Sequence, residues 1–273
     1  MDVLAIIGVL VGVMGITLAI YYGNKPVILD EASINRLVGR ISEYKREDTP
    51  ESLKEEVKSA DKRIVNPKAA NDYFLKGYAS DMYGDFEKAI LHYKKAIQLN
   101  PDFALAYYNL GGAYSDMGKY DKAIESFQKA IQLNPMFEEA YGNMGIAYKN
   151  IGKYKEAIQC YRKMIKLNGN DEKTYFNMGN TYHKMGEFDK AIQSYKTALK
   201  LNPEYALVYD SMGVAYHYNG EYNKAIQSYQ KAIELNPDDA EVYHNMGCAY
   251  QELGNQVKAN KCFQIAIMLR EKK

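Results

Sequence analysis

Histidine and cysteine, two residue types that often act in catalysis or bind metals, are rare in this sequence. The 273 residues include four histidines and three cysteines, and no CxxC pair is present. His183 and His217 are 34 residues apart and His244 follows, so they either sense pH or bind a metal, or are ordinary surface histidines. No phosphate-binding glycine loop, HExxH or GxSxG motif occurs. We therefore expect no enzymatic activity, no cofactor and no metal site.

The charges of the chain are balanced, with 35 Lys and Arg against 34 Asp and Glu. Proteins that bind nucleic acids usually carry a strong positive charge, so we expect no nucleic-acid partner. A hydrophobic fraction of 47% is typical of a folded chain. The odd number of cysteines argues against a disulfide framework.

Several residues recur with a period of 34 from residue 70 onward, and they indicate the elements of the fold. A tyrosine stands four residues before each recurring glycine, and an alanine stands twelve residues after it. The recurring glycines are Gly77, Gly111, Gly145, Gly179, Gly213 and Gly247. Such a period predicts stacked copies of one structural unit.

Each unit has the pattern of two amphipathic helices. In the second unit, Leu110 and Tyr114 continue one apolar stripe, and Ala123 and Phe127 belong to another. Gly118 is suited to end the first helix, and an Asn-Pro pair ends the second. Because neither helix can bury its apolar face alone, neighbouring units must stack.

This pattern resembles the tetratricopeptide repeat family. The resemblance implies an all-α fold, a right-handed superhelical solenoid of six helix-turn-helix repeats over residues 70–273, with the first helix of each pair lining an inner groove. The repeats would be 70–103, 104–137, 138–171, 172–205, 206–239 and 240–273. Met164 and Gly169 depart from the family pattern, so we expect a looser junction between the third and fourth repeats.

The N-terminal residues predict a membrane anchor. Residues 3–22 carry no charge, and about 20 residues of helix cross a bilayer. We therefore assign 1–23 as a transmembrane helix, with a cleaved secretory signal as the alternative. Lys25, Arg36 and Arg40 follow the span and favour cytoplasmic repeats. Gly8 and Gly12 form a GxxxG pair that suits helix dimerisation.

Residues 24–69 predict a charged linker with two helices. Asp30 suits the N-cap of one helix, and Thr49-Pro50 suits the start of another. The pair is either a degenerate cap on the first repeat or a helical spacer.

The inner groove offers candidate peptide-binding residues. An asparagine recurs at the sixth position of a repeat, and its amide could bond to an extended backbone. The alternative is that asparagine is common there for structural reasons. The asparagines are Asn109, Asn143, Asn177 and Asn245.

Other groove positions suggest which partner would bind. Aromatic residues dominate the first two repeats, lysines the middle, and acids the end. A hydrophobic anchor beside an acidic stretch would complement this order. The candidates are Phe74, Tyr78 and Tyr108, then Lys149, Lys173 and Lys184, and finally Asp210, Glu241 and Glu252.

In the last repeat, Ile265 and Met268 replace polar residues at outward positions. This apolar face predicts either self-association or a rotated final helix.

Together these features predict a membrane-anchored, non-catalytic scaffold that binds a protein or peptide. The alternatives are a targeting receptor that hands client proteins to a membrane machine, and a non-catalytic subunit of an envelope-biogenesis or secretion complex. A homo-oligomer could form through the last repeat or the Gly8/Gly12 helix face.

Overall fold

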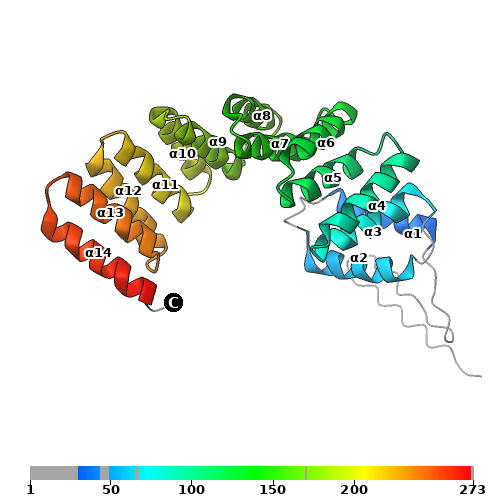
Figure 1. Cartoon of the computed structure of the whole chain (residues 1–273), viewed down its shortest axis with the longest axis horizontal. Coiled ribbons are helices and arrows are strands. Elements are labelled where there is room, and N and C mark those ends of the chain that lie inside the picture. The colour runs from blue at the N-terminus through cyan, green and yellow to red at the C-terminus, as the bar shows by residue number, and fades with distance from the viewer. Residues whose placement is uncertain (1–29, 44–48, 65–67, 170, 272–273) are drawn as a thin grey trace, which may run out of the picture. The chain divides into compact units, whose positions relative to one another are not determined.

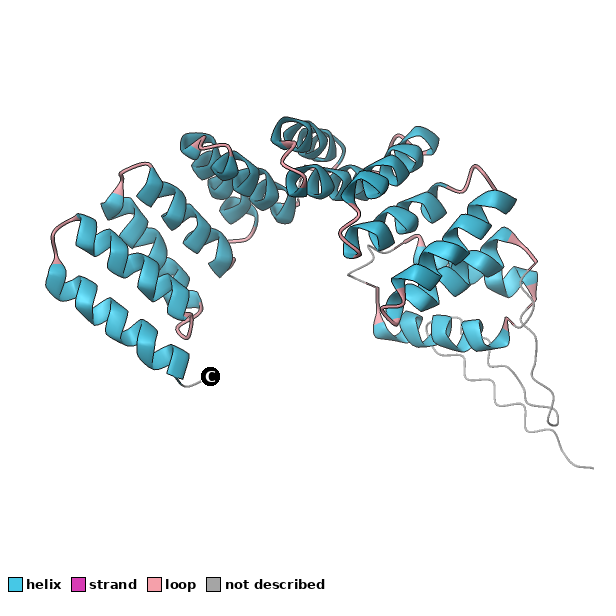
Figure 2. Cartoon of the chain, in the orientation of Figure 1, coloured by secondary structure: helices cyan, strands magenta, loops and turns pink. Residues whose placement is uncertain are grey.

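A computed structural model describes residues 30–43, 49–64, 68–169 and 171–271. These residues form fourteen α-helices joined by short loops, and they include no strand (Figures 1 and 2). The helices are α1 Glu31–Ile41, α2 Glu51–Arg63, α3 Ala70–Met82, α4 Phe86–Leu99, α5 Ala104–Asp116, α6 Tyr120–Leu133, α7 Glu138–Asn150, α8 Tyr154–Leu167, α9 Glu172–Lys184, α10 Phe188–Leu201, α11 Ala206–Tyr218, α12 Tyr222–Leu235, α13 Ala240–Glu252 and α14 Gln256–Glu271.

The chain divides into two compact units. The first ends at Pro101 and contains α1 to α4, and the second begins at Asp102 and contains α5 to α14. In the second unit, five helix hairpins follow one another in a row (Figure 1). The predicted all-helical solenoid of hairpin repeats is therefore confirmed.

Two glycines of each hairpin explain why the helices pair so closely. In the hairpin α5–α6, a Cβ added to Gly111 would lie 2.6 Å from the ring of Phe127, so only glycine allows this approach. Gly118 has a φ of 69°, a left-handed conformation that ends α5 and turns the chain into α6. Both roles recur with the 34-residue period.

In the third repeat, a larger and a smaller residue have exchanged volume. Met164 stands where the neighbouring repeats carry alanine, and Gly142 stands where others carry an aromatic ring. A Cβ on Gly142 would lie 2.6 Å from the sulfur of Met164, so the methionine fills the space above the glycine. The hydroxyl of Thr174 in α9 contacts the same sulfur at 3.1 Å. Met164 thus joins α7, α8 and α9.

The helices α1 and α2 pack against α3 inside the first unit. Asp30 caps α1 by accepting a hydrogen bond from the backbone N–H of Ser33 at 2.7 Å. The hydroxyls of Thr49 and Tyr78 are 2.8 Å apart and tie the start of α2 to α3. The apolar faces of both helices are buried, with Ile34, Leu37, Val38 and Ile41 on α1 and Leu53, Val57 and Ala60 on α2.

The predicted single-pass membrane location is contradicted. Within the described residues, no helix is both long and apolar enough to cross a bilayer. The longest, α14, has 16 residues and is about 24 Å long, whereas a hydrocarbon core is about 30 Å thick. The predicted span 1–23, its Gly8/Gly12 pair and Lys25 lie outside the described residues.

Candidate functional site

The first helices of the hairpins in the second unit form one continuous surface. Each of α5, α7, α9 and α11 contacts the first helix of the next hairpin. We call the exposed side of α5, α7, α9, α11 and α13 the first-helix surface. Equivalent side chains recur along it at intervals of 34 residues.

The predicted asparagines are engaged within the protein. The amide of Asn109 is buried and donates to the backbone carbonyl of Leu105 at 2.9 Å. The other three bond to the preceding first helix: Asn143 donates to the Tyr108 hydroxyl at 3.0 Å, Asn177 accepts from Lys149 Nζ at 3.3 Å, and Asn245 donates to Asp210 Oδ1 at 3.3 Å. These bonds link neighbouring repeats. Contact of the remaining amide groups with a peptide stays a prediction.

The predicted aromatic contacts need correction. Phe74, Tyr78 and Tyr108 are only 0%, 3% and 5% exposed. The Phe74 ring packs against Tyr93 with centroids 5.8 Å apart, and the Tyr108 ring packs against Phe137 at 4.7 Å. Because residues from other elements cover these rings, they offer almost no surface to a partner.

Two of the three predicted lysines lie close together. Lys149 is half-buried at the end of α7, and Lys184 is exposed at the end of α9. Burial lowers the pKa of Lys149, and the nearby Lys184 lowers it further. Within the described residues, neither lysine forms an ion pair with a carboxylate. Lys173 is exposed near the opposite end of α9, about 16 Å away by helix rise.

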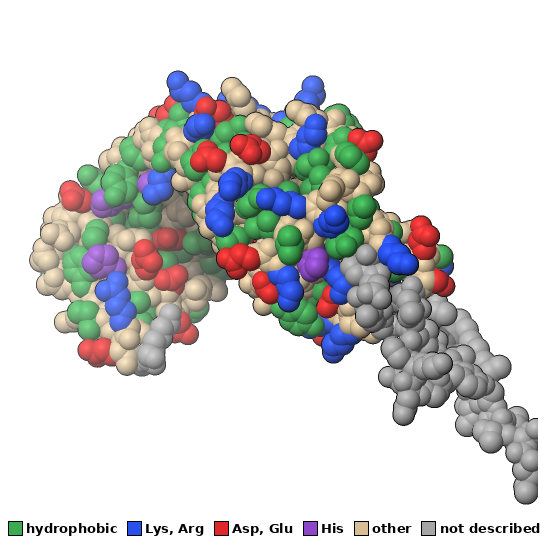
Figure 3. Space-filling view, turned by 45° about the vertical axis from the view of Figure 1, so that its right-hand side comes forward, with side chains coloured by type: hydrophobic (Ala, Val, Ile, Leu, Met, Phe, Trp, Pro, Cys, Tyr) green, Lys and Arg blue, Asp and Glu red, His purple; other side chains and the backbone are tan. Residues whose placement is uncertain are grey.

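This basic pair is a local feature. On the face of the molecule that Figure 3 shows, basic and acidic side chains are intermingled, as expected from the balanced charge of the chain. The pair therefore suits one or two acidic side chains better than a long polyanion.

A cluster of rings beside the lysines was not predicted. It contains His183, Phe188, His217, Tyr218 and Tyr222, from α9 to α12. Burial and then Lys184 lower the pKa of His183. The sequence feature that could have indicated this cluster is Tyr218, an aromatic residue at the position that Lys184 occupies in the preceding repeat. No group of three or more His, Cys, Asp or Glu suited to a metal ion occurs in the described part of the chain.

The acidic end of the first-helix surface contains a perturbed carboxyl group. The pKa of Asp210 is raised to about 6, mainly by burial and to a smaller extent by the negative charges of Asp239 and Glu241, while the hydrogen bond from Asn245 acts in the opposite direction. Glu252 is exposed.

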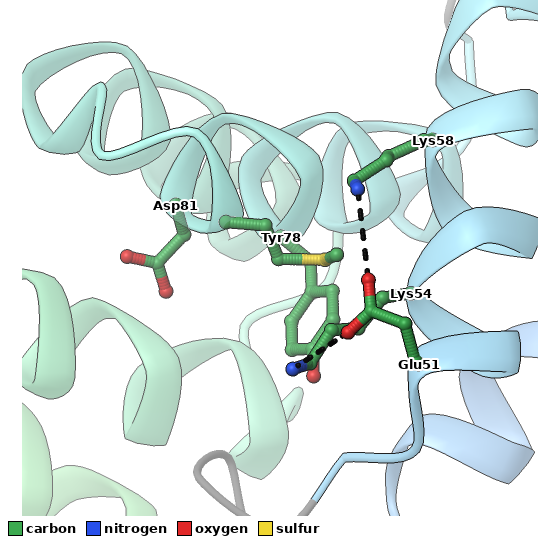
Figure 4. A pocket seen from close by; sticks show the side chains of 6 residues that line it. Glu51, Lys54, Lys58, Tyr78 and Asp81 are labelled. Carbon is green, nitrogen blue, oxygen red and sulfur yellow. Dashed lines mark hydrogen bonds and ion pairs between the residues drawn. The ribbon is translucent and has the colours of Figure 1, made fainter.

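The first unit contains a polar pocket of about 340 Å³ between α2 and α3 (Figure 4). Glu51 in this pocket contacts Lys54 at 3.3 Å and Lys58 at 3.9 Å. The two lysines are thus already paired with a carboxylate, unlike Lys149 and Lys184. Tyr78, Asp81 and Met82 line its other side.

The predicted self-association residues differ in exposure. Met268 is 54% exposed, whereas Ile265 is half-buried. Ile267 and Val257 are also exposed, at 54% and 82%. A contact between copies through α14 stays a prediction.

Sequence profiles of the tetratricopeptide repeat match most of the chain. The matched segments are 83–118, 104–137, 138–171, 160–193, 179–220, 213–254 and 240–273. Together they cover residues 83–273.

Solved structures of repeat proteins are also similar. A crystal structure of MamA is 30% identical, covers 60% of this chain and 95% of its own, and has a TM-score of 0.57. MamA from Desulfovibrio magneticus RS-1 is 22% identical, with coverages of 62% and 96% and a TM-score of 0.60. YrrB, described as a TPR protein with an unusual peptide-binding site, is 23% identical, with coverages of 66% and 92% and a TM-score of 0.56. No curated protein sequence matches the chain.

Proposed function

Because the chain belongs to the tetratricopeptide repeat family, we propose that it is a non-catalytic scaffold that binds an acidic peptide segment of a partner protein. The segment would lie on the first-helix surface, with an acidic side chain at Lys149 and Lys184. The similarity to MamA and YrrB supports a protein-interaction scaffold. The peptide-binding site named for YrrB supports a peptide as the form of the partner.

The uncompensated Lys149–Lys184 pair is the observation that carries this proposal. Burial of the Lys149 ammonium costs free energy, and the charge of Lys184 adds repulsion. A partner carboxylate would relieve both effects, because it would supply the negative charge that no described residue places beside these two lysines. One such contact between partly desolvated groups is worth about 1.5 kcal/mol, or roughly tenfold in affinity.

The hydrogen bond from Lys149 to Asn177 positions this charge. It joins α7 to α9 at 3.3 Å, so the ammonium is held between two neighbouring first helices. A partner carboxylate would therefore meet a preorganised cation. Lys173 would contact a different residue of the partner, since it lies near the other end of α9.

Site-specific crosslinking in cells tests the proposal. A photoreactive residue at Asn150, which is exposed beside Lys149, should capture a partner peptide that contains acidic residues. The same residue at Lys155, exposed on α8, is the matched control. Replacing both Lys149 and Lys184 with Met keeps most of the side-chain volume and removes the charge, so capture from Asn150 should fall at least tenfold.

Unchanged capture from Asn150 in the double Met variant would refute the acidic contact. Equal capture from Lys155 and Asn150 would refute the assignment to the first-helix surface. Stable copurification with one set of partners would indicate a scaffold, whereas rapid exchange among many would indicate a targeting receptor.

A further inference from the structure

Tyr218 is the aromatic residue most open to solvent in the ring cluster beside the basic pair. It is the last residue of α11, and 64% of its surface is exposed. The equivalent residues of the other first helices are Met82, Asp116, Asn150, Lys184 and Glu252. Tyr218 is therefore the one aromatic side chain at this position of the six repeats.

The other rings hold Tyr218 in place. Phe188 stacks on it with centroids 5.7 Å apart and an interplanar angle of 17°. The rings of His183 and His217 meet it at steep angles of 76° and 75°, with centroids at 5.5 Å and 5.9 Å. Three rings thus contact Tyr218, and most of the side chain nevertheless remains open to solvent.

This open ring lies next to the basic pair. His183 contacts Tyr218 and directly precedes Lys184 in α9, and Lys184 is close enough to lower the pKa of both His183 and Lys149. The surface therefore presents two ammonium groups and then an aromatic ring, on the consecutive first helices α7, α9 and α11.

We propose that Tyr218 binds an aromatic side chain of the partner, located about three residues from the acidic residue that meets Lys149 and Lys184. The acidic contact rests on the proposed function, whereas the aromatic contact rests on the geometry of Tyr218. The partner segment would thus carry an acidic and an aromatic residue at a defined spacing.

The spacing follows from the distance between adjacent helices. Lys184 and Tyr218 are equivalent residues of α9 and α11, which contact each other and whose axes should be about 8–10 Å apart. An extended peptide advances about 3.3 Å per residue, so three residues cover this distance.

An aromatic side chain fits this place better than a cation. A guanidinium can stack on a tyrosine ring, but here it would approach Lys184 and meet repulsion of like charges. A neutral ring adds offset stacking to the burial of apolar area without this cost.

Fluorescence anisotropy with synthetic peptides tests the inference on the full chain. The probe is a fluorescein-labelled Gly/Ser peptide of twelve residues that carries one Asp-Asp pair and a Phe three residues after it. Two further probes have Ala in place of Phe, or Phe directly after the acidic pair. We expect the first probe to bind about three- to tenfold more tightly than either of the others.

The protein variants form a double-mutant cycle with the peptides. Tyr218→Ala should weaken the Phe probe about three- to tenfold and leave the Ala probe unchanged, while Tyr218→Phe should retain the preference. Circular dichroism of both variants checks that the helical fold is kept. Equal weakening of both probes by Tyr218→Ala, or no weakening of either, would overturn the aromatic contact.

A third variant distinguishes this inference from the proposed function. Lys149→Met with Lys184→Met should weaken the Phe and Ala probes by the same factor. If this variant binds both probes as tightly as the native protein but the Phe preference persists, the acidic contact is wrong and the aromatic contact holds.

Discussion

Replacing Asp210 with Asn should stabilise the protein at neutral pH. Asp210 is half-buried in α11, and among the described residues it accepts a hydrogen bond from the amide of Asn245 and forms no ion pair with a cation. An Asn side chain has the same shape and can accept the same hydrogen bond through its oxygen. The substitution therefore removes the buried charge and preserves the contact between α11 and α13.

The magnitude follows from the pKa of Asp210. Its rise from 3.8 to about 6 corresponds to about 3 kcal/mol, because one pKa unit equals about 1.4 kcal/mol. Between these pH values the folded protein holds a proton that the unfolded chain has lost, so stability falls as pH rises and the full penalty is present above pH 6. Asp210→Asn should therefore stabilise by about 2–3 kcal/mol at pH 7.5 and by only about 0.5 kcal/mol at pH 4.

Urea denaturation followed by circular dichroism at pH 4, 6 and 7.5 measures this effect. Asp238→Asn, at an exposed aspartate in the turn before α13, is the matched control and should change stability by less than about 0.5 kcal/mol at each pH. An Asp210→Asn variant that is no more stable than the native protein at pH 7.5, or equally stabilised at all three pH values, would refute the reasoning.

Three further predictions concern packing and association. Gly111→Ala should cost about 1–3 kcal/mol in urea denaturation, because the new methyl would lie 2.6 Å from a buried ring. Gly142→Ala should lower the free energy of unfolding, because the new methyl group would clash with the Met164 sulfur, and adding Met164→Ala should recover part of this loss. If the free-energy changes of the two single variants simply add up in the double variant, the volume exchange is contradicted. Sedimentation velocity should show that Ile265→Lys with Met268→Lys lowers the association state; a native protein that is already monomeric would exclude self-association.

Local signals allowed the helices to be predicted from the sequence. Gly118 ends a helix because its own backbone adopts a positive φ. Asp30 caps a helix by accepting a hydrogen bond from the backbone N–H of Ser33, only three residues further along the chain. The 34-residue period predicted the bounds of each hairpin, because the same residue types pack the two helices together in every repeat.

Exposure of the candidate site residues could not be predicted from their positions in the repeat. Lys173 and Lys184 are exposed, whereas Tyr108 is buried and its ring packs against Phe137, and contact of the lysines with a partner stays a prediction. The role of Tyr218 could not be predicted, because its position in the repeat does not show which rings of the neighbouring helices pack against it.

The sequence alone determined the repeat, its helices and the glycines that let them pair, since these depend on interactions within one hairpin. The tertiary structure decided which side chains remain open, because burial depends on the neighbouring repeat. The partners of Asn143 and Asn245 lie 35 residues away in the chain. Such contacts exist only once the hairpins have stacked, so they set the surface that a partner meets.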